Sequence, residues 1–170
     1  MKDQSLEKKN GELVKKQVGE RLRPYGFAKT KPAFYTRLCE DRIEFIHLHK
    51  FRTGPSFRVH TGIRFLVDDM DVVALNGIQA SGYKNEYPIH YHFNYHKEED
   101  TVLRCAEQIV LFIENEALPW FTLWREEQHL TARHDSPLRS ELAPRYSKFK
   151  NGIYEEEVIH KSKKLMGIKP

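Results

Sequence analysis

Histidine is the residue type of this sequence whose placement best suits chemistry. Six of the nine histidines fall in runs that alternate apolar and polar residues, and two pairs have the spacing His-x-His. On a β-strand such a pair projects both rings to the same side, with Cα atoms roughly 6.5–7 Å apart. Both rings can then reach one metal ion, and a third histidine from a neighbouring strand leaves an open coordination position, as in catalytic zinc sites. A candidate transition-metal site, with zinc as its metal, is therefore formed by His47, His49, His60, His90 and His92.

The same histidines have two other interpretations. A half-exposed sheet face tolerates imidazoles because these rings are amphipathic and bond readily to water or to neighbouring side chains. On this interpretation the chain needs no cofactor. Clustered imidazoles also titrate near neutral pH, so the third interpretation is a pH-sensitive binding face. The sequence leaves all three open.

Two predicted strands position these histidines, Ile43–Lys50 and Phe57–Phe65, and the short turn FRTGPS joins them. A loop this short cannot make a crossover, so we expect the strands to be antiparallel. Side chains alternate between the faces of a strand, and the apolar residues must share one face. The core face then carries Ile46, Leu48, Val59, Thr61 and Ile63. The reverse face carries the residues that we predict to bind a ligand, which are His47, His49, Arg58, His60 and Arg64.

Two further segments have strand patterns. Ala33–Leu38 (AFYTRL) precedes the central hairpin, and Tyr87–His96 (YPIHYHFNYH) alternates strictly, with its histidines opposite its aromatic residues. If Tyr87–His96 joins the sheet, six histidines share one face. Between these segments, Val72–Leu75 is a short apolar piece that suits either a short strand or one turn of helix.

Apolar residues at helical spacing predict four helices. They cover about residues 5–23, with Gly26 as a left-handed cap, then 97–118, 120–130 and 153–166, and Pro119 separates the second from the third. The predicted fold class is α+β, an antiparallel sheet of about four strands with helices packed on one face. Residues 1–130 form a single domain in this prediction, and residues 131–170 form a polar linker and a C-terminal helix packed on it.

Composition narrows the function classes. The net charge of +4 comes from Lys and Arg scattered among Asp and Glu, whereas nucleic-acid binders concentrate positive charge on one face. Residues 145–150 (RYSKFK) mix basic and aromatic groups as single-strand binders do, but a solvated loop with two anchoring aromatic residues explains them more simply. No window approaches the roughly 18 apolar residues of a membrane span, and the first twelve residues lack an apolar signal core. We therefore expect a cytoplasmic protein without a membrane or nucleic-acid partner.

Signatures of common catalytic sites are missing from the sequence, including the phosphate-binding, serine-nucleophile and zinc-protease motifs. The two cysteines, Cys39 and Cys105, lack metal or redox spacing and are expected to be free thiols. Cys39 precedes Glu40 and Asp41, whose charges raise the pKa of a thiol, so it makes a poor nucleophile. No catalytic residue is therefore predicted.

Several segments taken together resemble a bacterial family. A helix ending in RPYGF is followed by AFYTR, a strand ending in LHK, FRVHTGI after the turn, and a later helix that runs into LPWF. This arrangement resembles the domain-of-unknown-function family numbered four-three-zero-four, over about residues 13–124. The resemblance implies the fold but no activity, cofactor or catalytic residue. The family pattern has glutamine near His49 and asparagine near His60, which implies that these histidines are not an inherited metal site.

The sequence thus predicts a small binding or interaction protein without catalysis of its own. Its partner would be an unknown protein or a small anionic ligand, held by the histidines and arginines of the sheet. An immunity-type protein that antagonises a toxin is one version, motivated by the chain's size and by the lack of catalytic motifs. The alternative is a metal-dependent enzyme, a hydrolase or isomerase built on the five candidate histidines.

Overall fold

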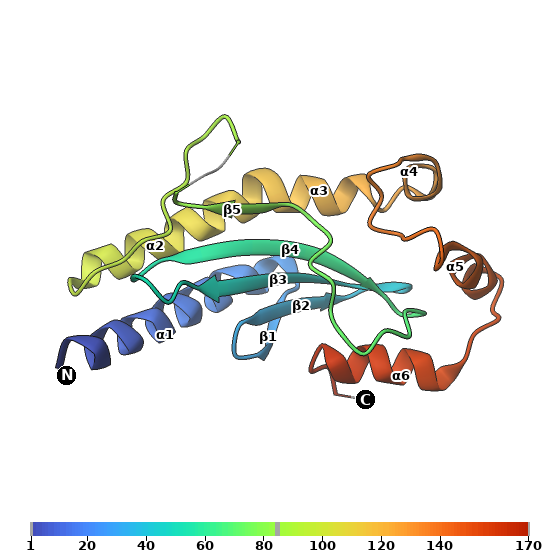
Figure 1. Ribbon diagram of the computed structural model, residues 1–170, viewed down its shortest axis with the longest axis horizontal. Helices are drawn as coiled ribbons and strands as arrows, with labels where there is room; N and C mark the ends of the chain where they lie inside the picture. The colour runs from blue at the N-terminus through green and yellow to red at the C-terminus, as the bar shows by residue number, and fades with distance from the viewer. Residues whose placement is uncertain (1, 84–85, 170) are drawn as a thin grey trace.

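Five antiparallel strands form one sheet in the order in which they occur along the chain (Figure 1). The computed structural model describes residues 2–83 and 86–169, and side chains from residue 4 onward. The predicted α+β fold is confirmed, with five strands in place of about four. They are β1 (Ala28–Lys31), β2 (Phe34–Leu38), β3 (Arg42–Lys50), β4 (Phe57–Phe65) and β5 (Gln79–Ser81).

The register of β3 against β4 follows the alternation of apolar side chains. Ile46 pairs with Thr61, and Leu48 pairs with Val59. All four side chains are buried on the same face, because any shift by one residue would turn the apolar set to the other side. The predicted pairing of even positions with odd positions is therefore confirmed.

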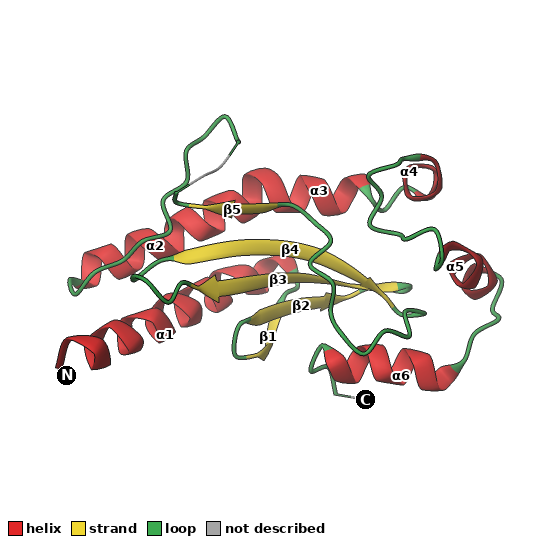
Figure 2. Ribbon diagram, in the orientation of Figure 1, coloured by secondary structure: helices red, strands yellow, loops and turns green. Residues whose placement is uncertain are grey.

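A layer of helices covers this first face of the sheet (Figure 2). It consists of α1 (Lys2–Leu22), α2 (Glu99–Phe112) and α3 (Leu118–Leu123). A short 3-10 turn, η1 (Arg23–Tyr25), follows α1 and ends at Gly26, whose φ of 84° is the predicted left-handed cap. No helix in the described ranges has the length and apolar character needed to cross a bilayer.

The helical chain does not stop at Pro119 as predicted. A π-helical turn, η2 (Ile113–Ala117), joins α2 to α3, and the N–H of Leu118 donates to the carbonyl of Ile113. Pro119 lies at the start of α3, where a helix needs no N–H from it. The wider turn therefore carries the helix past the proline.

The second face of the sheet is partly covered by the C-terminal part of the chain. Three helices follow α3, namely α4 (Glu127–Ala132), α5 (Ala143–Lys150) and α6 (Glu156–Leu165). Met166, at the end of α6, is fully buried in a small cluster with Ile43, Phe45 and Leu66. The first layer of helices packs on one face of the sheet as predicted, and α6 packs in addition on the other face, because Ile43 and Phe45 form a second apolar patch at the odd positions of β3. The polar linker that was predicted before the C-terminal helix is not irregular throughout, because it contains α5.

Gly62 on β4 allows the second patch to pack. A Cβ atom at this position would overlap the ring of Phe45, which is its neighbour across the β3–β4 ladder. The Phe45 ring can therefore pack directly against the backbone of the glycine, fully buried.

Candidate functional site

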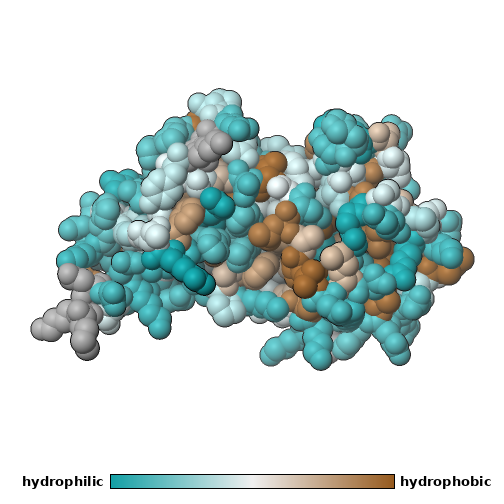
Figure 3. All heavy atoms as spheres, viewed as in Figure 1, coloured by the Kyte–Doolittle hydropathy of each residue, from teal (hydrophilic) through white to brown (hydrophobic). Residues whose placement is uncertain are grey.

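One end of the second face is left uncovered by α6, and it carries most of the predicted binding residues. We call it the open face, and it is formed by Phe34, His47, His49, Phe51, Arg58 and His60. Strand register explains how they meet. Phe34, His47 and His60 are successive neighbours across β2, β3 and β4, and His49 pairs with Arg58 in the next row. Figure 3 shows this side of the molecule, where hydrophobic residues gather near the centre among mostly hydrophilic surroundings.

His47 lies at the centre of a stack of rings. The centroid of Phe34 lies 4.4 Å from the centroid of His47 on one side. On the other side the centroid of His60 lies 5.7 Å away, with the two ring planes 25° apart. The Nδ1 atom of His47 is buried and has no hydrogen-bond partner among the described residues. A buried polar atom without a partner is costly, and no described acceptor at this nitrogen favours the protonated form of the ring.

Both stacked imidazoles resist protonation. Burial lowers the pKa of His60 to about 4, and the neighbouring His47, Arg58 and His49 add to the shift. Burial likewise lowers the pKa of His47, with smaller contributions from His49 and Lys15. A cation is disfavoured both by the loss of water and by other positive charges. The two rings are therefore neutral at physiological pH.

Arg58 supplies the permanent charge of the open face. Its guanidinium carbon lies 5.2 Å from the centroid of Phe51, and Phe51 in turn meets the exposed Tyr83 edge to face at 5.6 Å. No carboxylate of the described residues forms an ion pair with Arg58. Its N–H donors therefore remain free for a carboxylate or phosphate group.

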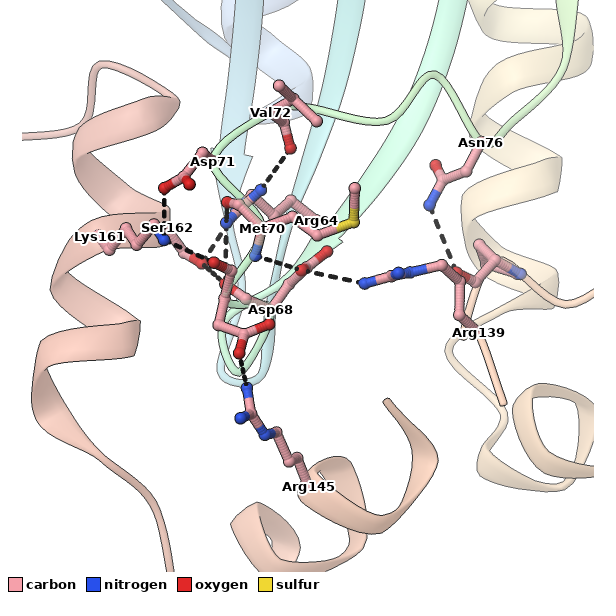
Figure 4. A network of polar contacts seen from close by, with 12 residues as sticks. Arg64, Asp68, Met70, Asp71, Val72, Asn76, Arg139, Arg145, Lys161 and Ser162 are labelled. Atoms are coloured by element: carbon pink, nitrogen blue, oxygen red, sulfur yellow. Dashed lines mark hydrogen bonds and ion pairs between the residues drawn. The ribbon is translucent and has the colours of Figure 1, made fainter. Parts of the chain in front are cut away.

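Arg64 does not lie with the histidines, and its predicted role on the binding face is wrong. It pairs with Ile43 toward the other end of the ladder and is only 3% exposed. Figure 4 shows its guanidinium bonded to the Ser162 hydroxyl and to the backbone carbonyls of Asp68, Met70 and Val72. Alternation places Arg64 on the correct face, but α6 covers this part of the face, so Arg64 is a structural residue.

The acidic segment beside Arg64 fastens the C-terminal part to the sheet (Figure 4). Asp68 pairs with Arg139 at 3.2 Å, Asp69 with Arg145 at 2.5 Å, and Asp71 with Lys161 at 2.6 Å. These carboxylates are therefore occupied in holding the second layer in place.

The remaining candidate histidines lie in Tyr87–His96, which does not form the predicted strand. One isolated bridge, between Ser56 and Asn94, joins it to the end of the sheet. β5 already occupies the edge of β4 at residues 58–60, so the segment reaches only the beginning of β4. The alternation of aromatic and polar residues in this segment nevertheless corresponds to one buried side, since Tyr91, Phe93 and Tyr95 are fully buried.

His90 and His92 form an exposed pair with ring centroids 4.6 Å apart. Within residues 2–83 and 86–169, no three His, Cys, Asp or Glu side chains are grouped so that they could hold one metal ion. The five histidines predicted as ligands therefore do not meet at one point there. The carboxylate of Glu44 does not join the histidines either. It lies on the first face of the sheet, fully buried and paired with Arg37 and Arg125.

Both cysteines are free. Burial and then the charge of Glu44 raise the pKa of Cys39, so the predicted direction is confirmed, although Glu40 and Asp41 are not its cause. Burial raises the pKa of Cys105 to about 12. Neither thiol is thus activated as a nucleophile.

A separate hollow of about 230 Å³ lies where α5 meets the start of α6. Two cations line it, but Arg145 is paired with Asp69 and Glu155 adds a negative charge. It therefore offers a charged ligand less than the open face does. Its lining consists of Val67, Arg145, Lys148, Ile153, Tyr154, Glu155 and Val158.

Sequence reasoning missed the aromatic members of the open face. Phe34 is the neighbour of His47 across β2 and β3, and assigning faces along the predicted strand Ala33–Leu38 would have found it. Phe51 of the open face and the adjoining Tyr83 lie outside the strands, where alternation gives no signal.

Comparisons of this chain with models of protein families, with curated proteins and with solved structures find no match. The resemblance to the bacterial family therefore stays a prediction.

Proposed function

We propose that this protein is a non-catalytic binding module whose open face receives an acidic segment of a partner protein. The observation that carries the proposal is the charge of the open face. Arg58 has no ion-pair partner among the described residues, and none of the six side chains of the open face is a carboxylate. An acidic segment supplies the missing negative charge.

The side chains of the open face also suit a protein partner. Arginine and aromatic residues are enriched where protein interfaces are energetically strongest. Phe51 holds the guanidinium of Arg58 by a cation–π contact, and the planar N–H donors of an arginine match the geometry of carboxylate oxygens. Phe34 and Tyr83 add aromatic surface beside the charge. The combination favours a peptide that carries both carboxylates and apolar groups.

Central strands give the open face a fixed shape. His47 and Arg58 lie on β3 and β4, which are paired over nine residues each. Because their backbone is already ordered, binding costs little conformational entropy. A preformed surface of this kind binds through its existing geometry.

An NMR titration of the ¹⁵N-labelled protein with hexaglutamate tests the proposal, with hexaglutamine as the uncharged control peptide. Shift changes are expected at Phe34, His47, Arg58 and His60 with hexaglutamate only. Arg58→Gln should weaken binding by at least about tenfold, as expected for a hydrogen bond to a charged group.

Arg104→Gln is the matched control variant, because Arg104 is an exposed residue of α2 in the helical layer. It removes the same charge and should leave the affinity unchanged. Equal weakening by the two variants, or shift changes spread evenly over the basic surface, would contradict a site on the open face.

A further inference from the structure

The two stacked histidines of the open face are arranged as a seat for a single carboxylate. His47 and His60 come from adjacent strands and are direct neighbours in the ladder, so the sheet holds the backbone of the two residues side by side. Phe34 covers the other side of the His47 ring. Neither ring makes a hydrogen bond to a described residue, and both side chains are only half-buried. An accessible ring nitrogen that carries a proton can therefore donate to a carboxylate oxygen.

The charged groups around the two rings also support a site for a negative charge. The groups that act on them are His49 from β3, Arg58 from β4 and Lys15 from α1. None of these groups is acidic, so in the free protein no neighbour favours the imidazolium form. Both rings are therefore neutral until a negative charge arrives.

We propose that His47 and His60 form a carboxylate subsite, and that a partner's carboxylate binds there together with a proton from solvent. This inference rests on the proposed function of the open face. The proton goes to an imidazole nitrogen, which becomes a donor to the bound carboxylate, and no covalent bond forms or breaks.

Proton uptake makes binding depend on pH. A carboxylate in contact with an imidazolium stabilises the charged ring and raises its pKa. The bound state then holds more protons than the free state at mildly acidic pH, so affinity increases as pH falls. For one proton, the gain approaches tenfold for each pH unit between the pKa of the bound ring and that of the free ring.

The first experiment uses the free protein and needs no ligand. An NMR titration follows the ring signals of His47 and His60 between about pH 3 and pH 8. His60 is expected to titrate with a midpoint near 4, and His47 below the usual value. A midpoint near 6.5 for both rings, the value of a free histidine, overturns the inference whatever binds to the open face.

The second experiment measures proton uptake directly. Calorimetry of hexaglutamate binding at about pH 6, in two buffers with different protonation enthalpies, gives the number of protons taken up. The unsubstituted protein should take up a large fraction of one proton, and His60→Gln should take up almost none. His47→Gln is an independent second variant, and His134→Gln, at an exposed position, is the matched control.

The outcomes separate the two proposals. Binding on the open face without proton uptake overturns the carboxylate subsite and leaves the proposed function standing. No binding of hexaglutamate to the open face at about pH 5 or pH 7 overturns both. Proton uptake that persists in both histidine variants also overturns the subsite, because the proton then goes elsewhere.

Discussion

The Nε of Arg64 donates a hydrogen bond to the hydroxyl oxygen of Ser162 at 2.9 Å, and so joins β4 to α6 across 98 positions of sequence. Its other nitrogens bond to three backbone carbonyls of the loop after β4. One buried guanidinium thus holds both the loop and the last helix against the second face.

Arg64→Met should destabilise the protein by about 3 kcal/mol. Methionine preserves much of the length of the side chain but leaves the carbonyls of Met70 and Val72 without their donor. The carbonyl of Asp68 keeps only the Ser162 hydroxyl, and buried acceptors without a partner are costly. The measurement is urea unfolding at neutral pH. Arg139→Met is the control, because its pair with Asp68 is partly exposed and should contribute less than about 1 kcal/mol. Similar losses of unfolding free energy for both variants would contradict a larger contribution from the buried hydrogen bonds of Arg64.

Gly167→Ala should destabilise the protein more than Gly152→Ala. Both glycines have positive φ, 71° and 78°, so alanine costs about 1–2 kcal/mol at either site. At Gly167 the new Cβ would also lie 2.5 Å from the carbonyl oxygen of Thr30, whereas nothing lies within 4 Å of it at Gly152. The difference in unfolding free energy measures the contact between the end of α6 and β1. Equal effects would mean that this contact is absent in solution.

Gly62→Ala should cost about 1–3 kcal/mol, because a methyl group would force the buried Phe45 ring away from β4. The cost should fall in a Phe45→Leu background, and a double-mutant cycle gives the coupling. Gly54→Ala is the control, since the nearest atom to its Cβ is the Tyr83 hydroxyl at 3.8 Å. It should change stability by less than about 0.5 kcal/mol. Full additivity of Gly62→Ala and Phe45→Leu would contradict the packing.

His60 should make the folded state less stable as pH falls from about 6.5 to about 4. Its pKa is about 4 in the folded protein and about 6.5 in the unfolded chain, so between these values the unfolded state binds more protons. Stability from this residue is complete above about pH 6.5 and declines below it. His60→Gln should flatten the pH dependence of urea unfolding in this window. An unchanged slope would mean that His60 is solvated.

Much of the central hairpin could be predicted from the sequence because alternation is a local property. Ile46, Leu48 and Val59 had to share a face, and this choice placed His47 beside His60 without any knowledge of the rest of the chain. Arg64 shows the limit of the same argument. The alternation of side chains predicts the face of the sheet on which Arg64 lies. Its burial, however, depends on packing against Ser162 of α6, which lies far along the chain, and no local sequence pattern indicates such a contact.

The segment Tyr87–His96 shows a second limit. Alternating residues report that one side of an extended chain is buried, and Tyr91 and Phe93 are buried as the pattern implies. The pattern does not report whether the backbone has a partner strand. Here β5 takes the available edge of β4, so the histidines of this segment are separated from those of the central hairpin.

The sequential order of the strands has a consequence for the chain as it leaves the ribosome. Each strand emerges after the neighbour it will pair with, whereas α6 is made last. Until then Ile43 and Phe45 have no helix over them, and their apolar patch is continuous with the ring stack of Phe34 and His47. The nascent protein therefore exposes this apolar patch until α6 has emerged and packed on it, and in that interval the patch is a surface that a chaperone can bind.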